Sequence, residues 1–488
     1  MIRFTEENGA LIARSRNETI RIEGWGNNAL RVRTTLLKKL PRDAHALTEN
    51  VAHSAKVTID EGSETAEIVN GKIKATVNGV GIICFYKDNE LILQEYYSYY
   101  YGSVRKEAIC YKIRSREYKG LASDDFKITV RFESDPKEKL FGMGQYQMPI
   151  LDLKGSVLPL EQRNSQVSVP FVVSNKGYGM LWNNPSTGEA AFGTNITKWI
   201  SDESDMVDYW ITADDTPAQI VTNYTECVGR APVMSKDYLG LWQCKLRYRT
   251  PDEVLEVARK YKELGIRLDV IVIDFFHWPH QGDWRFDEKY WSRDAVKAMT
   301  DELHAMGTKV MVSVWPSVDK RSENYYEMEQ KALISTTDVG SVQTYDYEGD
   351  CGTVDFFNPE AQEFVWSKCK QNYRDWGIDL FWLDNSEPDS TKYDFENYRY
   401  YTGRGSKVGC EYPKKYVEAF YNGQEAEGDH EAVNLCRSAW VGSQKYRTLV
   451  WTGDVQSNFE SFKDQVIAGQ NMGLAGIPWW TTDIGGFM

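Results

Sequence analysis

The first 230 residues alternate between apolar and polar side chains with the two-residue period of half-buried β-strands. Residues 18–23 and 29–33 alternate in this way, with a Gly-Asn-Asn turn between them. Residues 66–69 and 72–77 flank an Asn-Gly dipeptide at 70–71, which is a strong hairpin signal. Helical periodicity is scarce, so this half is predicted to be an antiparallel β-sandwich. The remaining strand patterns lie at 127–132, 168–173 and 179–182.

The second half of the chain alternates between helical and strand patterns. Thr250 and Glu253 form a capping box with Pro251 at the first helical position, and one apolar helical face runs on to Gly265. Further helical patterns cover residues 294–306 and 359–376. Strands that alternate with helices pair in parallel, so this half is predicted to be an α/β barrel of the (β/α)8 TIM type. Seven strands are predicted, at 239–245, 268–274, 310–315, 378–384, 432–437, 447–451 and 475–479.

The change of period sets the predicted domain boundary near Ala231 and Pro232. Residues 1–232 then form the N-terminal β-sandwich domain and residues 233–488 form the barrel. The sequence stops directly after the seventh predicted strand, although a barrel closes its hydrogen-bonded edges with an eighth. We therefore expect a barrel that is truncated after strand seven.

Composition excludes several functional classes. The formal charge of −14 disfavours nucleic acid as a partner, and no apolar stretch is long enough to span a membrane. The amino terminus has no apolar signal region, and none of the eight cysteines forms a CxxC pair, so a cytoplasmic protein is expected. The six histidines form no HExxH pattern, so no metal is expected. A homo-oligomer is compatible with these features.

Charged residues gather where the predicted barrel strands end. In a βα barrel, catalytic side chains lie at the carboxyl ends of the strands. A single aspartate there is most simply a helix N-cap, but four aspartates and an arginine on different strands favour a site. Paired carboxylates suit glycoside hydrolysis, and the abundant nearby aromatic side chains suit the faces of sugar rings, although Trp382 is expected in the core. The residues at these strand ends are Asp274, Trp315, Asp384, Arg437, Asp454 and Asp483.

Four ordered motifs in this half resemble those of glycoside hydrolase family 31, the retaining α-glycosidases. Trp382-Leu383-Asp384-Asn385-Ser386-Glu387-Pro388 resembles the nucleophile signature, and Trp451-Thr452-Gly453-Asp454 resembles the acid/base segment. Residues 476–487 resemble the seventh-strand motif, and residues 273–278 with 283–287 resemble the second-strand loop. Residues 141–145 and 164–184 resemble the family's N-terminal β domain, whose loop reaches the barrel mouth. The resemblance thus covers most of the chain.

The resemblance implies roles for individual residues. Asp384 would be the nucleophile, with Arg437 lowering its pKa, and Asp454 would be the general acid/base. Retention of configuration would require their carboxyl groups to lie about 5–5.5 Å apart. No cofactor is expected, because an acid/base and a nucleophile suffice. Glu387 would support the loop after the fourth strand. The residues expected to bind substrate are Asp274, Trp315, Arg437, Trp451, Asp483, Phe276 and Trp278.

The substrate implied is a small oligosaccharide or α-glycoside. Residues 275–278 crowd the position next to Asp274, and the sequence is most similar to bacterial α-xylosidase-like members, so cleavage of α-xylosides is the first expectation. An α-glucosidase, an α-galactosidase or a transglycosylase of the same family is the alternative, because one hydroxymethyl group changes binding by only about 1–3 kcal/mol. The triplet Asn385-Ser386-Glu387 departs from the Met-Asn-Glu of many members, which leaves the sugar open. A non-catalytic carbohydrate-binding protein is the rival class, and it would need neither acid.

Overall fold

The computed structural model of the chain describes residues 2–49, 51–62, 64–96, 114–122, 124–387 and 394–488. It forms two compact units. Unit 1 comprises Met1–Glu161, Val167–Arg230 and Asn458–Pro478, and unit 2 comprises Gln162–Gln166, Ala231–Ser457 and Trp479–Met488. Each unit therefore includes a segment from the other half of the sequence.

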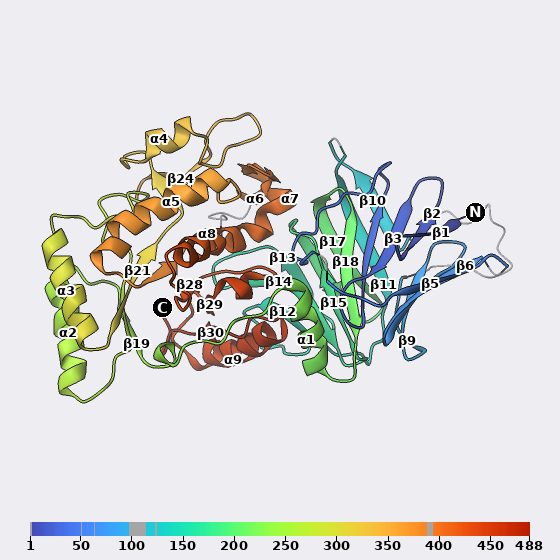
Figure 1. Cartoon of the computed structure of the whole chain (residues 1–488), viewed down its shortest axis with the longest axis horizontal. Coiled ribbons are helices and arrows are strands. Elements are labelled where there is room, and N and C mark those ends of the chain that lie inside the picture. Colours follow the sequence, from blue (N-terminus) through green and yellow to red (C-terminus); the bar gives the residue numbers. More distant parts are fainter. Residues whose placement is uncertain (1, 50, 63, 97–113, 123, 388–393) are drawn as a thin grey trace. The chain divides into compact units, whose positions relative to one another are not determined.

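Unit 1 is built mainly from three antiparallel sheets (Figure 1). The eight-stranded sheet has the order β1 (Arg3–Glu7), β2 (Ala10–Arg14), β3 (Thr19–Gly24), β4 (Ala29–Thr35), β18 (Val207–Ala213), β15 (Tyr178–Trp182), β14 (Val167–Ser174) and β12 (Leu140–Gln145). One five-stranded sheet has the order β10 (Arg116–Gly120), β11 (Phe126–Glu133), β17 (Ile196–Ser204), β16 (Gly188–Phe192) and β13 (Val157–Leu160). The other has the order β5 (Lys56–Asp60), β6 (Thr65–Asn70), β7 (Ile73–Val77), β8 (Ile83–Lys87) and β9 (Glu90–Gln94). Apolar side chains from all three sheets form one core, which confirms the predicted antiparallel β domain.

Two local predictions in unit 1 need correction. The hairpin between β6 and β7 forms, but Asn70 pairs with Ile73, so the two connecting residues are Gly71 and Lys72 rather than Asn70 and Gly71. Gly71 has a φ of +60°, and a Cβ at this position would collide with Asn28. Helix α1 (Pro217–Val228) closes the first half of the chain and was not predicted, although Thr216 caps it and Pro217 begins it.

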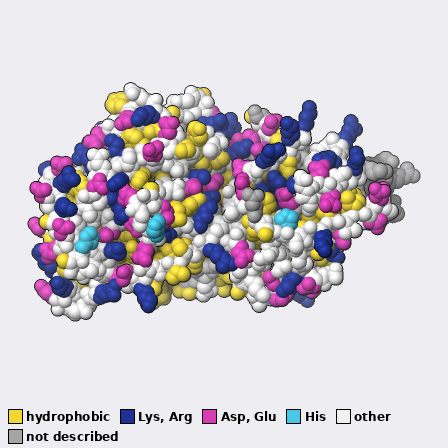
Figure 2. Space-filling view, in the orientation of Figure 1, with side chains coloured by type: hydrophobic (Ala, Val, Ile, Leu, Met, Phe, Trp, Pro, Cys, Tyr) yellow, Lys and Arg dark blue, Asp and Glu magenta, His cyan; other side chains and the backbone are white. Residues whose placement is uncertain are grey.

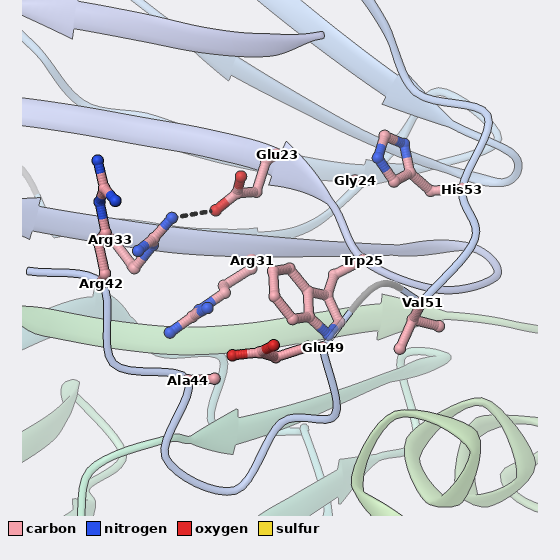
Figure 3. Close-up of a pocket in the computed structure, with 10 residues that line it drawn as sticks. All are labelled: Glu23, Gly24, Trp25, Arg31, Arg33, Arg42, Ala44, Glu49, Val51 and His53. Atoms are coloured by element: carbon pink, nitrogen blue, oxygen red, sulfur yellow. Dashed lines mark hydrogen bonds and ion pairs between the residues drawn. The ribbon is translucent and has the colours of Figure 1, made fainter. Parts of the chain in front are cut away.

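Strand β4 is buried along its whole length instead of alternating, because it is a central strand. Its two arginines are neutralised there. Arg31 forms a bidentate ion pair with Asp208, with distances of 3.0 and 2.6 Å, and Arg33 pairs with Glu23 at 2.5 Å. Both line a cavity of about 360 Å³ beside Trp25 (Figure 3), and Arg31 lies 4.8 Å from the centre of the indole ring. These ion pairs make the arginines part of the packing of unit 1.

Unit 2 contains a parallel sheet of seven described strands, in agreement with the predicted number. Their order is β19 (Trp242–Lys245), β20 (Val270–Ile273), β21 (Lys309–Val314), β25 (Leu380–Leu383), β28 (Asn434–Cys436), β29 (Thr448–Trp451) and β30 (Trp480–Thr481). The α-helices are α2 (Pro251–Glu263), α3 (Arg293–Ala305), α4 (Tyr325–Gln330), α5 (Pro359–Asn372), α6 (Asp394–Asn397), α7 (Gly405–Val408) and α8 (Tyr412–Ala426). Short 3-10 helices lie at η2 (Lys236–Tyr238), η3 (Arg374–Trp376), η4 (Gly409–Glu411) and η5 (Ser443–Tyr446). Two small antiparallel sheets are formed by β22 (Ser317–Asp319), β24 (Asp350–Thr353) and β23 (Thr344–Asp346), and by β26 (Arg399–Tyr400) and β27 (Gly403–Arg404).

In this half of the chain, the capping residues predict correctly where two of the helices begin. The Thr250 hydroxyl accepts from the backbone N–H of Glu253, and the Asn358 side chain accepts from that of Glu360, as capping predicts. Helices α2 and α3 lie side by side (Figure 1), joined by the pair of Arg259 with Glu302 at 2.7 Å. The predicted helix 359–376 instead ends at Asn372 and is followed by η3.

The seventh strand lies later than predicted. Residues 475–477 are buried in the turn that follows α9 (Phe459–Leu474) and form no strand, while Pro478 is exposed and Trp479 is half-buried. Gly476 has a φ of +85°, and the N–H of Ile477 donates to the carbonyl of Met472. The strand β30 consists of Trp480 and Thr481, which pair with Val450 and Trp451 of β29, and the carbonyl of Trp479 accepts from the N–H of Val450. Helix α9 itself belongs to unit 1, where Asn471 accepts from the N–H of Gly142 at 2.9 Å.

The distribution of surface charge and the length of the helices concern the predictions about nucleic-acid binding and membrane spanning. Figure 2 shows acidic and basic side chains interspersed over the visible face. Among the residues that the structure describes, no helix is long and apolar enough to cross a membrane.

Candidate active site

Strand parity decides which side chains face the interior of the sheet of unit 2. Val270, Val272, Met311, Leu380 and Trp382 belong to one apolar cluster inside the curved sheet. Their neighbours along the strands pack against the helices in a second cluster. Because side chains alternate along a strand, continuing the interior series in steps of two residues, once or twice, leads to the positions just beyond the strand ends. Those positions are Asp274, Trp315 and Asp384, and the same step from Leu435 leads to Arg437.

Asp384 is buried at the end of β25, with 5% of its surface exposed. Its Oδ1 accepts from the backbone N–H of Asn385 at 2.7 Å and lies 3.1 Å from Nη1 of Arg437. Burial is the largest influence and raises the pKa of Asp384, whereas the Arg437 charge and the Asn385 hydrogen bond oppose the rise. Arg437 therefore lowers the pKa of Asp384 as predicted, and desolvation outweighs it, so the net pKa lies above the ordinary value.

Arg437 connects the nucleophile candidate to Glu387. The guanidinium donates from Nε to Oε2 of Glu387 at 2.8 Å and from Nη2 to Oδ1 of Asn385 at 2.9 Å. Glu387 is almost completely buried. Burial lowers the pKa of Arg437, but the negative charges of Glu387 and Asp384 outweigh this effect and raise the pKa of Arg437 above its ordinary value. The arginine is thus fixed by three neighbouring acceptors while it faces Asp384.

Asp274 and Asp483 join the same electrostatic cluster. Burial raises the pKa of Asp274 to about 7, with smaller contributions from Asp384, Asp483 and Asp454, while a hydrogen bond from the N–H of Phe275 opposes the rise. Burial also raises the pKa of Asp483 to about 6, with contributions from Asp454 and Asp384. All four aspartates predicted from the strand ends therefore lie within electrostatic reach of one another. Among the described residues they do not form a group that could hold a metal ion.

Asp454 lies past the end of β29 and is half-buried. Its Oδ2 accepts from Nδ2 of Asn164 at 2.5 Å, and its backbone N–H donates to Oδ1 of Asn164 at 3.3 Å. Asn164 lies in the loop between β13 and β14, within the segment Gln162–Gln166 of unit 2. This contact spans 290 positions, so local sequence patterns carry no signal for it.

Aromatic rings form a wall beside the carboxylates. Trp315 stacks on Phe275 with ring centres 5.1 Å apart and on Tyr347 at 5.5 Å, and Trp278 meets it edge-on at 6.0 Å. Phe276 instead has a φ of +66° and lies under Arg247, with the guanidinium 4.6 Å from its ring centre. Tyr347 was missed by the sequence argument, since it lies in the connection between β23 and β24. The pKa of Tyr347 is raised by burial and further by the charges of Asp384 and Asp454 among others, which places it in the site.

Trp451 and Trp382 lie deeper inside the sheet. Their rings meet edge-on with centres 5.3 Å apart, and both pack in the interior cluster, as expected for Trp382. Trp451 is 4% exposed, so it forms the floor of the site rather than an open face.

His277 is buried on the side of the sheet that faces the helices. Burial lowers the pKa of His277 to about 4, and the Tyr373 hydroxyl lies 2.9 Å from its Nε2.

A parallel sheet whose carboxyl ends carry a buried aspartate–arginine pair, three further aspartates and an aromatic wall is the architecture of a barrel glycosidase. Comparison with known proteins agrees with this class. Residues 231–488 match the model of the glycosyl hydrolases family 31 TIM-barrel domain, and residues 19–190 match that of the glycosyl hydrolase 31 N-terminal galactose mutarotase-like domain. The chain belongs to glycoside hydrolase family 31.

Individual relatives extend the match to most of the chain. An uncharacterized family 31 glucosidase of Pseudescherichia vulneris is 47% identical over 496 residues, covering 100% of this chain and 93% of the relative. An α-xylosidase of Saccharolobus solfataricus is 34% identical and covers 74% of this chain and 50% of the relative. The crystal structure of a family 31 α-xylosidase from a soil metagenome, complexed with xylose, superposes with a TM-score of 0.94 at 46% identity, over 100% of this chain and 72% of that one.

Proposed function

We propose that the protein is an exo-acting retaining α-glycosidase that removes terminal α-xylosyl residues through a covalent glycosyl–Asp384 intermediate. The observation that carries the proposal is the buried Asp384–Arg437 pair at the carboxyl end of β25, within reach of Asp454. The xylose complex of a solved relative that is 46% identical supports the choice of sugar.

Two displacements would share the work between the two acids. In the first, the Asp384 carboxylate attacks the anomeric carbon while Asp454 gives its proton to the departing glycosidic oxygen. In the second, Asp454 takes a proton from water, the water oxygen attacks the same carbon, and the bond to Asp384 breaks. Arg437 supports the first step because its charge favours the ionised form of Asp384.

The remaining residues would bind the sugar. Asp274 and Asp483 are suited to accept hydroxyl protons, and a protonated Asp274 can also donate, because its pKa is about 7. The Trp315 ring is already stacked on Phe275, which crowds the space beside Asp274. We propose that this crowding disfavours the hydroxymethyl group that distinguishes glucose from xylose.

The test is a panel of p-nitrophenyl α-xyloside, α-glucoside and α-galactoside, with the anomer released followed by NMR. We expect the largest kcat/KM for the α-xyloside and first release of the α-anomer. Asp384→Ala should abolish turnover but keep the folded circular dichroism spectrum. Equal or faster cleavage of the α-glucoside would refute the proposed sugar, and first release of the β-anomer would refute retention.

An α-glucosidase is the second candidate, because a relative 47% identical is named a family 31 glucosidase and another relative, at 28% identity, is an α-glucosidase of Bacillus thermoamyloliquefaciens. The ratio of the two kcat/KM values decides between the candidates. Sugar transfer is separable by product analysis with xylose or glucose added as acceptor. A purely sugar-binding protein would bind xylose as tightly with Asp384→Ala as without it and would show no turnover in either form.

We also propose a cytoplasmic location. Among the described residues, Cys84, Cys227, Cys244, Cys351, Cys369 and Cys436 are free thiols, which suits a reducing compartment. The net charge of −14 supports a small glycoside rather than nucleic acid as the partner. Cell fractionation tests the location.

A further inference from the structure

The loop 162–166 is built to approach Asp454 closely. Gly453 has a φ of +74°, and a Cβ there would lie 2.6 Å from Oδ1 of Asn164 and 2.8 Å from the backbone nitrogen of Ser165. Only glycine at this position lets the loop and the end of β29 meet at that distance. The sequence therefore reserves space for Asn164 beside Asp454.

The loop is also fixed from its other side. The Ser165 hydroxyl donates to Oδ1 of Asn164 at 3.3 Å, and Ser165 itself has a φ of +66°. Gln162 is fully buried, where its Oε1 accepts from the Ser438 hydroxyl at 3.1 Å and its Nε2 donates to the carbonyl of Cys410 at 3.1 Å. Ser438 directly follows Arg437, so the loop is attached to two different strand ends of the site.

We propose that Asn164 is the positioning residue that orients the carboxyl group of Asp454 and decides which of its oxygens carries the catalytic proton. The inference rests on the proposed role of Asp454 as the general acid/base. An amide Nδ2 only donates, so the oxygen that it contacts, Oδ2, stays an acceptor. The proton of the acid is then held on Oδ1, which becomes the oxygen that serves the leaving group.

The same contact has a second consequence for the reaction. In the second displacement Asp454 accepts the proton of water, and the fixed contact at Oδ2 leaves Oδ1 as the oxygen that receives it. The reciprocal bond from the Asp454 N–H to Oδ1 of Asn164 fixes the orientation of the amide, so Nδ2 always faces the carboxylate. A single residue would thereby serve proton delivery and proton removal.

The test uses the full chain with Asn164→Ala and Asn164→Asp, measured with aryl α-xylosides whose phenol leaving groups differ in acidity. A weakly acidic phenol needs a proton from the general acid in order to leave, whereas a strongly acidic phenol leaves as the anion without it. With Asn164→Ala we expect kcat/KM to fall roughly 10- to 100-fold for the poorest leaving group. For a dinitrophenyl leaving group the loss should be within about 3-fold. Asn164→Asp adds a second negative charge beside Asp454, so the alkaline limb of the pH profile should move up by about one pH unit.

Two controls separate the possible failures. Asn195→Ala removes an exposed asparagine from unit 1 and should leave every profile unchanged. Asp454→Ala should show the same leaving-group dependence more strongly, with turnover of the activated substrate restored by azide. If Asp454→Ala lacks this signature, the proposed function fails. The positioning role is refuted, while the proposed function stands, if Asp454→Ala shows the leaving-group dependence but Asn164→Ala does not. In that case Asn164→Ala would lower kcat/KM equally for all substrates, or for none of them.

Discussion

Asp274 is expected to destabilise the folded protein at neutral pH. It is 4% exposed, and burial with three neighbouring aspartates raises its pKa to about 7 from an ordinary value of 3.8. Its pKa is therefore higher in the folded state than in the unfolded state, so its contribution is most favourable below pH 4 and is lost as the pH rises through 7. The variant Asp274→Asn imitates the protonated form at every pH.

The shift sets the size of the effect. About three pKa units correspond to roughly 4 kcal/mol. Because Asp274 titrates together with Asp384 and Asp483, we expect Asp274→Asn to raise the free energy of unfolding by about 2–4 kcal/mol at pH 8. At pH 4 the difference should be only about 0.5 kcal/mol, because Asp274 is protonated in the folded protein and little more than half ionised in the unfolded chain. Asp274→Asn should nevertheless lose most of its activity, because the substitution removes a carboxylate that is proposed to bind the substrate.

The assay is urea unfolding followed by tryptophan fluorescence at pH 4, 6 and 8. The matched control is Asp88→Asn, which removes a solvent-exposed carboxylate in a β-hairpin of unit 1. A stability difference for Asp274→Asn that is independent of pH, or a loss of stability at pH 8, would refute the electrostatic reasoning. The control should change the unfolding free energy by less than about 0.5 kcal/mol at all three values.

Three further outcomes follow from the same structure. Arg437→Met removes the positive charge together with two hydrogen bonds and the ion pair with Asp384, so kcat should fall at least about 100-fold. The acid limb of the pH profile should move to higher pH as Asp384 loses its favourable charge, and an unchanged profile would contradict this. Tyr347→Ala removes a ring stacked on Trp315 and should raise KM roughly 5- to 20-fold with little change in kcat, which steady-state kinetics with the α-xyloside would check. Arg31→Met leaves its buried aspartate partner unpaired and should lower the unfolding free energy by about 3–5 kcal/mol without altering the kinetics of the remaining folded enzyme, as calorimetry and active-site titration would show.

The local pattern of apolar and polar residues was sufficient to predict most of the helices and strands. The capping residues Thr250 and Asn358 act over three positions or fewer, so their helices begin where the sequence indicates. The apolar run 475–479 misled because a buried turn and a buried strand require the same side chains. Pairing partners, rather than hydrophobicity, decide which of them forms.

By itself, the sequence determined the two kinds of fold and the acids at the strand ends. Strands that alternate with helices run parallel, so their carboxyl ends, with Asp274 and Asp384, lie at the same edge of the sheet. Tertiary structure decided the rest. It brought Asn164 to Asp454 across 290 positions, added Tyr347 to the aromatic wall, and buried Asp384 deeply enough that desolvation outweighs the charge of Arg437. These properties depend on distance and burial in three dimensions, and a pattern along one chain encodes neither directly.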